Sequence, residues 1–256
     1  TKKLFQLKLA QGKKIYFASD FHLGAPDAAT SLQREKLLVE WLDEIKKEAQ
    51  ELFLVGDVFD FWFEYKTAVP KGFVRLLGKL AEISDAGIPI HYFTGNHDMW
   101  VRDYLSKECG MIIHSEPLTV TLDGKIFHIA HGEGLGSGHT AYKILLRIFR
   151  NKPLRILYSA LHPAIGMRIG HKWSLNSRLG KGISKGFLGE EEEDLIKYAN
   201  SFKGNKKPDY FIFGHRHLSM ALKLKNNSEV ILLGDWIKES SYASWDGKNL
   251  VLNKPD

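Results

Sequence analysis

The chain has 256 residues, of which 44% are apolar and 26% charged, as in a globular protein with one α/β domain, with or without an insertion. It has no run of about 18 apolar residues that would span a membrane, and its single cysteine, Cys109, excludes an intrachain disulfide and a thiolate metal cluster. The net charge of +6 suits a phosphorylated substrate, nucleic acid or an anionic membrane surface. Because the N-terminal residues lack the apolar core of a signal peptide and cysteine is scarce, we expect a cytoplasmic protein.

The N-terminal part of the chain alternates strands with helices. Short runs rich in β-branched and aromatic residues predict strands at 15–18, 52–55 and 90–93. Apolar residues at helical spacing predict helices at 31–47 and 73–86. This alternation is typical of an α/β sheet.

Hairpins follow in the later parts of the chain. Asp123-Gly124 is a strong signal for a tight turn between predicted strands at 118–121 and 126–129. Further strands and turns are predicted as follows: strands at 210–213, 221–224 and 230–233, and turns at 226–227 and 246–247. Strands alternating with helices and then hairpins indicate an α/β (α+β) protein with two packed sheets flanked by helices.

A basic and apolar segment lies between the predicted strands at 126–129 and 210–213. Residues 134–189 include no Asp or Glu but ten Lys and Arg. Pro153 and Pro163 interrupt its apolar pattern, as expected between short helices. We predict two parts: a core formed by residues 1–135 and 190–256, and a helical insertion at 136–189.

Five clusters of metal-competent side chains each follow a predicted strand. The clusters are Asp20 and His22, Asp57, Asn96-His97-Asp98, His131, and His215 with His217. In open α/β sheets, sites form outside the carboxyl ends of the strands, so these clusters can converge although they are distant in sequence. Each motif alone is compatible with a turn or a structural hydrogen bond. Together and in this order they predict one shared site.

The residue types favour a dinuclear metal site. Histidine, carboxylate and amide ligands without thiolate suit Mn, Fe or Zn rather than a structural zinc site. Two cations about 3.5–4 Å apart need a bridging carboxylate, and we predict that Asp57 supplies it.

These motifs resemble those of the calcineurin-like metallophosphoesterase family, across residues 20–217. The likeness implies an αββα sandwich of two mixed sheets with a helical cap. It also implies that His97, with Asp98 beside it, protonates the leaving group or stabilises the phosphoryl oxygens. The implied ligands are Asp20, His22, Asp57 and His217 for the first metal, and Asp57, Asn96, His131 and His215 for the second.

One branch of this family is most similar, the UDP-2,3-diacylglucosamine pyrophosphohydrolases. The resemblance rests on the block at 56–62, on Gly-Asn-His-Asp-Met-Trp, and on the block at 131–136 with Tyr142 and Lys143. It implies cleavage of UDP-2,3-diacylglucosamine to UMP and 2,3-diacylglucosamine 1-phosphate in lipid A biosynthesis. It further implies manganese as the metal and work at the cytoplasmic face of the inner membrane.

The basic, apolar insertion fits an acylated, anionic substrate. Its cations would hold phosphate, and its apolar helix faces would take acyl chains or lie on an anionic leaflet. The predicted substrate contacts are Asn96, His97, Tyr142, Ser177, Arg178, Lys181 and Lys185.

Three other functions compete with this prediction. A phosphodiesterase or nucleotide pyrophosphatase for a soluble substrate would not need a long apolar groove. A non-catalytic binding module of the same fold would have lost ligands, yet all seven are present. A nucleic-acid phosphodiesterase would suit the positive charge, but the basic segment lacks a ladder of aromatic residues for stacking bases, so nucleic acid is not an expected partner. The sequence leaves the oligomeric state open.

Overall fold

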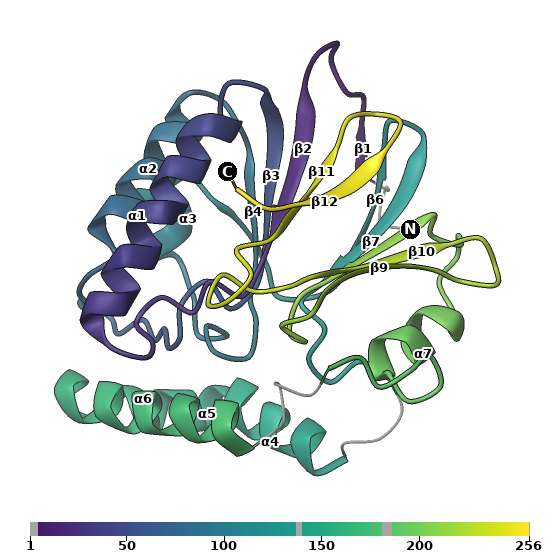
Figure 1. The fold of residues 1–256 in the computed structure, drawn as a ribbon. Helices are drawn as coiled ribbons and strands as arrows, with labels where there is room; N and C mark the ends of the chain where they lie inside the picture. Colours follow the sequence, from purple (N-terminus) through teal and green to yellow (C-terminus); the bar gives the residue numbers. More distant parts are fainter. Residues whose placement is uncertain (1–4, 137–139, 181–185, 256) are drawn as a thin grey trace.

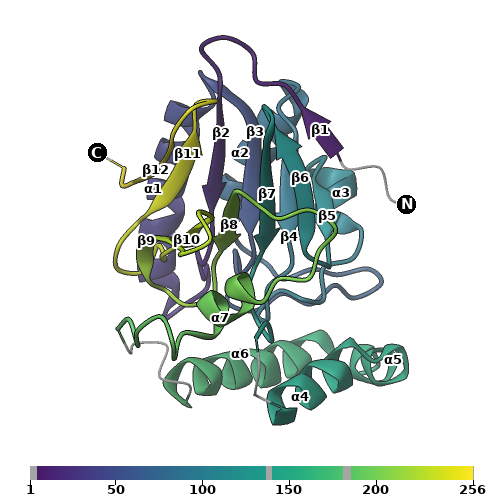
Figure 2. The ribbon, with the colours of Figure 1, turned by 90° about the vertical axis from the view of Figure 1, so that its right-hand side faces the viewer.

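The computed structural model describes residues 5–136, 140–180 and 186–255, and within these ranges the side chains of Phe5, 140–143 and 177–180 are not described. Two six-stranded sheets pack face to face, with helices on both outer sides and three further helices beneath one end (Figures 1 and 2). The expected αββα sandwich of mixed sheets is therefore confirmed.

The first sheet has the strand order β12-β11-β2-β3-β4-β5. Strands β2 to β5 run parallel, whereas β11 pairs antiparallel with both β2 and β12. The bounds are Lys14–Ala18 (β2), Ala49–Val55 (β3), Ile90–Phe93 (β4), Ile112–His114 (β5), Tyr242–Trp245 (β11) and Leu250–Asn253 (β12). The three predicted strands of the N-terminal part thus lie side by side in this sheet.

The second sheet has the order β1-β6-β7-β8-β10-β9. The β6/β7 and β9/β10 hairpins are antiparallel, whereas β7, β8 and β10 are parallel neighbours. The bounds are Phe5–Leu7 (β1), Leu118–Leu122 (β6), Lys125–Ala130 (β7), Tyr210–Phe213 (β8), Ser219–Lys223 (β9) and Glu229–Leu233 (β10). Asp123 and Gly124 both have positive φ, as the tight turn between β6 and β7 requires.

Apolar cores hold the layers together. Phe17, Phe53 and Phe127 stack between the two sheets, with ring centroids 5.1 Å and 5.9 Å from Phe17. The outer face of the first sheet is covered by α1 (Ala28–Ile45), α2 (Val74–Asp85) and α3 (Tyr104–Glu108), and that of the second by α7 (Asp194–Asn200). Helix α1 begins before its predicted start because the Asp27 side chain caps it, accepting from the backbone of Ala29 and Thr30.

Helices α4 (Thr140–Arg150), α5 (Lys152–Ser159) and α6 (Pro163–Gly180) form a layer beneath the sandwich, and we call these three helices the cap (Figure 1). Both prolines lie at helix starts, where a missing backbone N–H is tolerated: Pro153 in the first turn of α5, and Pro163 at the first residue of α6. Trp100 Nε1 donates to the Phe149 carbonyl over 3.0 Å, which joins the cap to the core. No helix in the described ranges is long and apolar enough to cross a membrane.

Candidate dinuclear metal centre

The five predicted clusters meet at one end of the sandwich, at the carboxyl ends of β2, β3, β4, β7 and β8. Asp20, His22 and His217 form one group whose ligand atoms lie within 4.8 Å of one another. His217 Nε2 is 3.2 Å from Asp20 Oδ1 and 2.9 Å from His22 Nε2. A second such group consists of Asp57, His131 and His215. Each group contains three of the four residues of one implied ligand set, and the Asp57 carboxylate lies 3.2 Å from His131 Nε2 and 3.9 Å from His22 Nε2.

The protein fixes which nitrogen of His131 faces the centre. His131 Nδ1 lies 2.8 Å from the Val55 carbonyl. Because a carbonyl can only accept a hydrogen bond, Nδ1 carries a proton, and in the neutral ring Nε2 then presents its lone pair to the centre. Metal-ligating histidines are oriented by the same kind of partner.

Several polar atoms in the centre are buried without a hydrogen bond to any described residue. They include Asp20 Oδ1, Asn96 Oδ1 and His131 Nε2. A buried polar atom left unpaired costs about 1–3 kcal/mol. Oxygen and imidazole nitrogen atoms that converge in this way fit divalent cations such as Mn²⁺, Fe²⁺ or Zn²⁺. The residues present therefore fit a dinuclear metal group.

Burial and charge keep Asp57 and His215 in the states that cations require. Burial alone would raise the pKa of Asp57, but the charges of His131 and His97 lower it far below its ordinary value. Burial lowers the pKa of His215 to about 3, with a further contribution from His131. Asp57 is therefore a carboxylate and His215 a neutral imidazole near neutral pH, as ligation needs.

His22 differs from these two residues. Burial alone would lower the pKa of His22, but hydrogen bonds with Asp20 and Asp60 outweigh burial and raise it to about 10. This ring therefore releases a proton when it binds a cation.

Five ligands have left-handed backbone conformations. The φ angles are 56° at Asp20, 45° at His22, 51° at Asp57, 67° at His215 and 50° at His217. This region costs a non-glycine residue about 1–2 kcal/mol, although Asp and His tolerate it better than most. Strain at so many positions in one place indicates a site whose geometry is imposed by the surrounding packing.

Two glycines allow the loops to approach one another. A Cβ atom on Gly95 would lie 2.2 Å from Asp57 Oδ1, and one on Gly56 would lie 2.5 Å from His131 Nδ1. Both distances are far below van der Waals contact, so any side chain there would displace a ligand.

His97 is buried against both the core and the cap. Its Nδ1 lies 2.9 Å from the Asp60 carbonyl and 2.9 Å from Ser174 Oγ of α6. Its Nε2 lies 3.9 Å from the Asp57 carboxylate, and burial lowers the pKa of the imidazole. The cap therefore reaches the centre through a side chain that the sequence did not indicate.

The Asp98 carboxylate braces the ligand loops. It accepts from the backbone N–H of Val58 and Gly95 over 2.9 Å and 2.7 Å, and from the Tyr92 hydroxyl. These contacts tie the loop after β4 to the loop after β3. The His97 ring is not among these partners, so the implied role of Asp98 beside His97 in catalysis stays a prediction.

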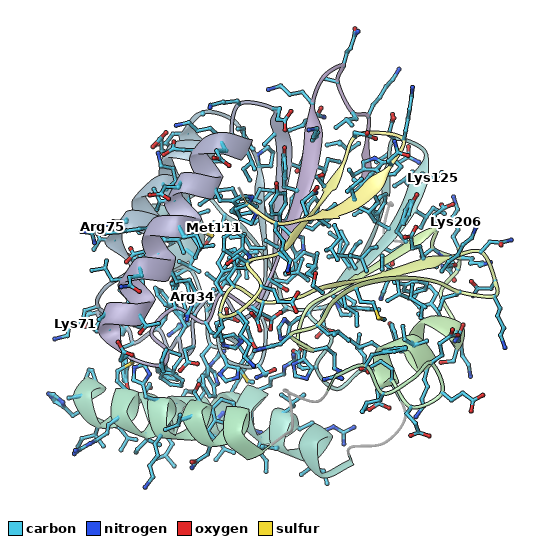
Figure 3. All side chains as sticks on the ribbon, in the orientation of Figure 1. Arg34, Lys71, Arg75, Met111, Lys125 and Lys206 are labelled. Atoms are coloured by element: carbon cyan, nitrogen blue, oxygen red, sulfur yellow. The ribbon has the colours of Figure 1, made fainter. Side chains whose placement is uncertain are left out.

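Three residues that support the ligands were not predicted from the sequence. Asp60 Oδ1 lies 3.6 Å from His22 Nδ1, and Asp235 Oδ2 lies 3.4 Å from His217 Nδ1. The buried Arg34 guanidinium donates to the carbonyls of Phe21, His22 and Ala25, which holds the first ligand loop against α1 (Figure 3). Asp60 stands in the Gly-Asp-x-x-Asp motif, whereas nothing in the sequence marks the other two.

The predicted substrate contacts divide into two groups. Asn96 and His97 lie in the centre and are buried. Tyr142, Ser177 and Arg178 lie on α4 and α6, but their side chains are outside the described part of the structure, as are residues Lys181 and Lys185. Their predicted roles are therefore not tested.

An apolar cavity of about 350 Å³ adjoins the centre, between the cap and the loops after β3 and β4. Its walls include Phe61, next to Asp60, and Trp173, next to Ser174. The other lining residues are Phe63, Trp100, Ile148, Phe149, Leu154, Arg155, Tyr158, Ile169 and Gly170.

An αββα sandwich with nitrogen and carboxylate ligands gathered at its strand ends has the architecture of a metal-dependent hydrolase. A model of the calcineurin-like phosphoesterase family matches residues 13–219. The chain belongs to the calcineurin-like phosphoesterase family, and its activity is the hydrolysis of phosphate linkages.

Similar proteins carry the name UDP-2,3-diacylglucosamine hydrolase. One from Porphyromonas gingivalis is 44% identical over 252 residues, which cover 93% of this chain and 96% of the relative. One from Haemophilus influenzae is 26% identical over 239 residues, covering 91% and 93%. One from Shewanella pealeana is 26% identical over 243 residues, covering 93% and 97%.

Proposed function

We propose that the protein hydrolyses the diphosphate of UDP-2,3-diacylglucosamine to UMP and 2,3-diacylglucosamine 1-phosphate, a reaction of lipid A biosynthesis. The observation that carries the proposal is the apolar cavity beside the ligand clusters, because a soluble nucleotide would leave such a cavity empty. The name shared by relatives that align over nearly the whole chain supports the same substrate.

The seven ligands would hold two divalent cations, with Mn²⁺ as the proposed metal. Asp20, His22, Asp57 and His217 would bind the first cation, and Asp57, Asn96, His131 and His215 the second. Two bound cations supply Lewis-acid stabilisation of phosphoryl oxygens and make hydroxide available near neutral pH. The carboxylate of Asp57 faces both groups, which supports its role as the bridge.

His97 is the proposed proton donor. Its Nδ1 donates to the Asp60 carbonyl, so the ring orientation is set and Nε2 faces the centre. Because burial lowers its pKa, the ring holds a proton at Nε2 weakly, and as an imidazolium it would give that proton to the departing phosphate or stabilise its negative charge. Asp98 would act by holding the loop that carries His97 and Asn96.

The cap is the proposed substrate-binding part, with residues 136–189 as its bounds. The apolar cavity would receive acyl chains. Tyr142, Ser177, Arg178, Lys181 and Lys185 would contact the sugar or the diphosphate.

The cap surface would also contact an anionic membrane. On α5, Ile156 and Leu157 are 69% and 68% exposed, and Arg155 lies beside them. Apolar side chains next to cations are typical of a surface that lies in a lipid headgroup region. The location would then be the cytoplasmic face of the inner membrane. Wild-type protein should co-sediment with anionic liposomes, and Ile156→Ser with Leu157→Ser should reduce this; equal sedimentation of both proteins would refute membrane contact.

Product analysis tests the substrate. Manganese-loaded protein is offered UDP-2,3-diacylglucosamine and UDP-N-acetylglucosamine, with Asp57→Ala as the control. We expect UMP and 2,3-diacylglucosamine 1-phosphate from the acylated substrate alone, and neither product with the variant. Cleavage of a generic aryl phosphodiester but of neither UDP-sugar would replace this substrate by another phosphodiester or a soluble nucleotide. Loss of all hydrolysis would favour a binding module.

A further inference from the structure

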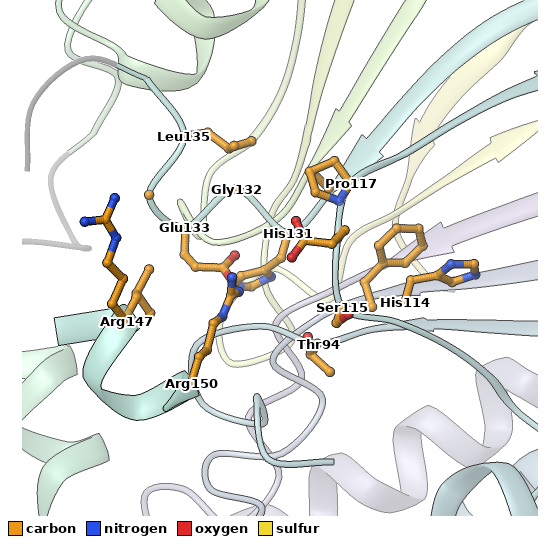
Figure 4. Close-up of a pocket in the computed structure, with 15 residues that line it drawn as sticks. Thr94, His114, Ser115, Pro117, His131, Gly132, Glu133, Leu135, Arg147 and Arg150 are labelled. Carbon is orange, nitrogen blue, oxygen red and sulfur yellow. The ribbon is translucent and has the colours of Figure 1, made fainter. Parts of the chain in front are cut away.

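A second cavity, of about 290 Å³, lies on a different face of α4 and beside the metal centre (Figure 4). Its lining comes from the ends of β4, β5 and β7 and from α4, and it includes His131 of the second ligand group. The lining includes Thr94, Ser115, Pro117, Glu133, Arg147 and Arg150. Unlike the apolar cavity, it combines two arginines with the acidic residues Glu116 and Glu133, hydroxyl groups and apolar walls.

Cations from the cap face this cavity. Arg150 Nη2 pairs with Glu133 Oε1 over 3.1 Å, which ties α4 to the loop that carries His131. Within the described ranges Arg147 has no ion-pair partner, and its guanidinium lies near the same mouth (Figure 4). A cation without a carboxylate partner beside a phosphate-cleaving centre is available for an anionic group of the substrate.

The walls of the cavity suit a flat ring with a polar edge. Phe93, Pro117, Leu135 and Leu146 supply apolar surface. Thr94 and Ser115 bring hydroxyl groups to the same lining, and each hydroxyl both donates and accepts. A nucleobase needs this combination, because its faces are apolar and its edge carries donors and acceptors.

Helix α4 separates the two cavities and contributes to both. Ile148 and Phe149 line the apolar cavity, whereas Arg147 and Arg150 line the polar one. The centre adjoins both cavities: His131 lines the polar one, and Trp173 of the apolar one lies against the His97 ring, with ring centroids 5.7 Å apart. A substrate with two chemically different ends joined by a diphosphate matches this arrangement.

We infer that the polar cavity receives the nucleotide half of a nucleoside diphosphate substrate while the apolar cavity receives its acylated half. The inference rests on the proposed function for the identity of the nucleotide. Arg147 contacts the nucleotide phosphate, and the Glu133 carboxylate accepts from ribose hydroxyls while Arg150 holds it in place. The base packs on the wall that contains Pro117 and Leu135.

Equilibrium binding of UMP and of inorganic phosphate to manganese-loaded protein, measured by titration calorimetry, tests the inference. Wild-type protein should bind UMP more tightly than phosphate, because phosphate reaches only the metals. Arg147→Ala should weaken UMP binding about tenfold, the effect of one charge-assisted hydrogen bond. Arg168→Ala is the matched control: it removes one exposed cap cation outside both cavities and should leave UMP binding unchanged.

Equal UMP affinity in Arg147→Ala and Arg168→Ala would overturn the inference, as would UMP binding no tighter than phosphate. Product analysis with wild-type protein separates this failure from that of the proposed function. If UDP-2,3-diacylglucosamine is cleaved but Arg147→Ala leaves the UMP affinity unchanged, the nucleotide binds elsewhere and the proposed reaction stands. If the substrate is not cleaved but Arg147→Ala loses UMP affinity, the cavity is a nucleotide site of an enzyme with another substrate.

Discussion

The ligand loops and the cap hold their side chains in opposite ways. In the loops, Asp20 and His22 are fully buried and His131 is 3% exposed, and each is fixed by neighbouring backbone or carboxylate groups. In the cap, Ile156 and Leu157 leave more than two thirds of their surface in solvent. The loops are thus built for one fixed geometry, whereas the cap keeps apolar surface free for a ligand. Changes in the loops should therefore affect the chemical step, and changes in the cap should affect recognition.

The largest expected effect follows from removing the bridging carboxylate. Asp57→Asn should lower kcat by at least about a thousandfold, because both ligand groups lose a shared charge. Metal analysis of the purified variant should show less than two bound cations per chain. A variant that keeps two cations and near-normal kcat would refute the bridging role.

A smaller loss is expected from a single added methyl group. Gly95→Ala would place Cβ against Asp57 Oδ1, and a ligand displaced by about 1 Å costs about a hundredfold in rate. Gly78→Ala in α2 is the matched control, since a Cβ there meets no atom within 4 Å. The control should keep full activity and gain about 0.5–1 kcal/mol in unfolding free energy. Equal activity of the two variants would show that the loops are less rigid than their packing implies.

Substitutions in the cap test whether it governs substrate recognition rather than the chemical step. Leu154→Glu puts a charge in the lining of the apolar cavity and should raise KM for UDP-2,3-diacylglucosamine about tenfold. Hydrolysis of a generic aryl phosphodiester should not change, because the ligand loops are untouched. Leu161→Glu, at an exposed cap position outside the lining, is the control. An equal loss on both substrates would mean that the cap also governs the chemical step.

The smallest effect on activity, with a clear effect on stability, is expected at a buried core histidine away from the centre. His128 lies between the Thr119 and Tyr198 hydroxyls, and burial lowers its pKa to about 4. Above pH 6.5 it is neutral in both folded and unfolded chains and contributes no pH dependence. Between pH 6.5 and 4 the unfolded chain binds the proton more readily, so stability falls by up to about 3 kcal/mol as the pH is lowered. His128→Gln should flatten this part of the stability curve in denaturant titrations; an unchanged slope would contradict the neutral, buried state.

Local pattern was enough to predict the central strands and the side chains that meet at the centre. Strands β2, β3, β4 and β8 are rich in apolar residues, and a strand end followed by Asp, Asn or His marks each loop of the centre. The acidic run at 190–194 carries no apolar periodicity, and α7 begins only at its last residue, Asp194. Strands β1 and β5 have three residues each and lie at sheet edges, so they carry too little periodicity to predict.

Residues that act through tertiary contacts could not be predicted. Arg34 and Ser174 lie on helices whose amphipathic patterns say nothing of the carbonyls or the imidazole they reach. Asp98 was correctly expected at the site, but its partners, Tyr92 among them, are defined only when two loops pack together. The same holds for the two cavities, which exist only where the cap meets the core.

The seven predicted ligands come from both sheets: Asp20, His22, Asp57 and Asn96 follow strands of the first, and His131, His215 and His217 follow strands of the second. A bound cation would therefore link the loops of the two sheets, and neither sheet could unfold without releasing it. Binding to the folded chain alone adds a stability of RT ln(1 + [M]/Kd). The melting temperature should therefore rise with the concentration of free metal. A cell short of the metal would lose folded protein as well as enzyme activity.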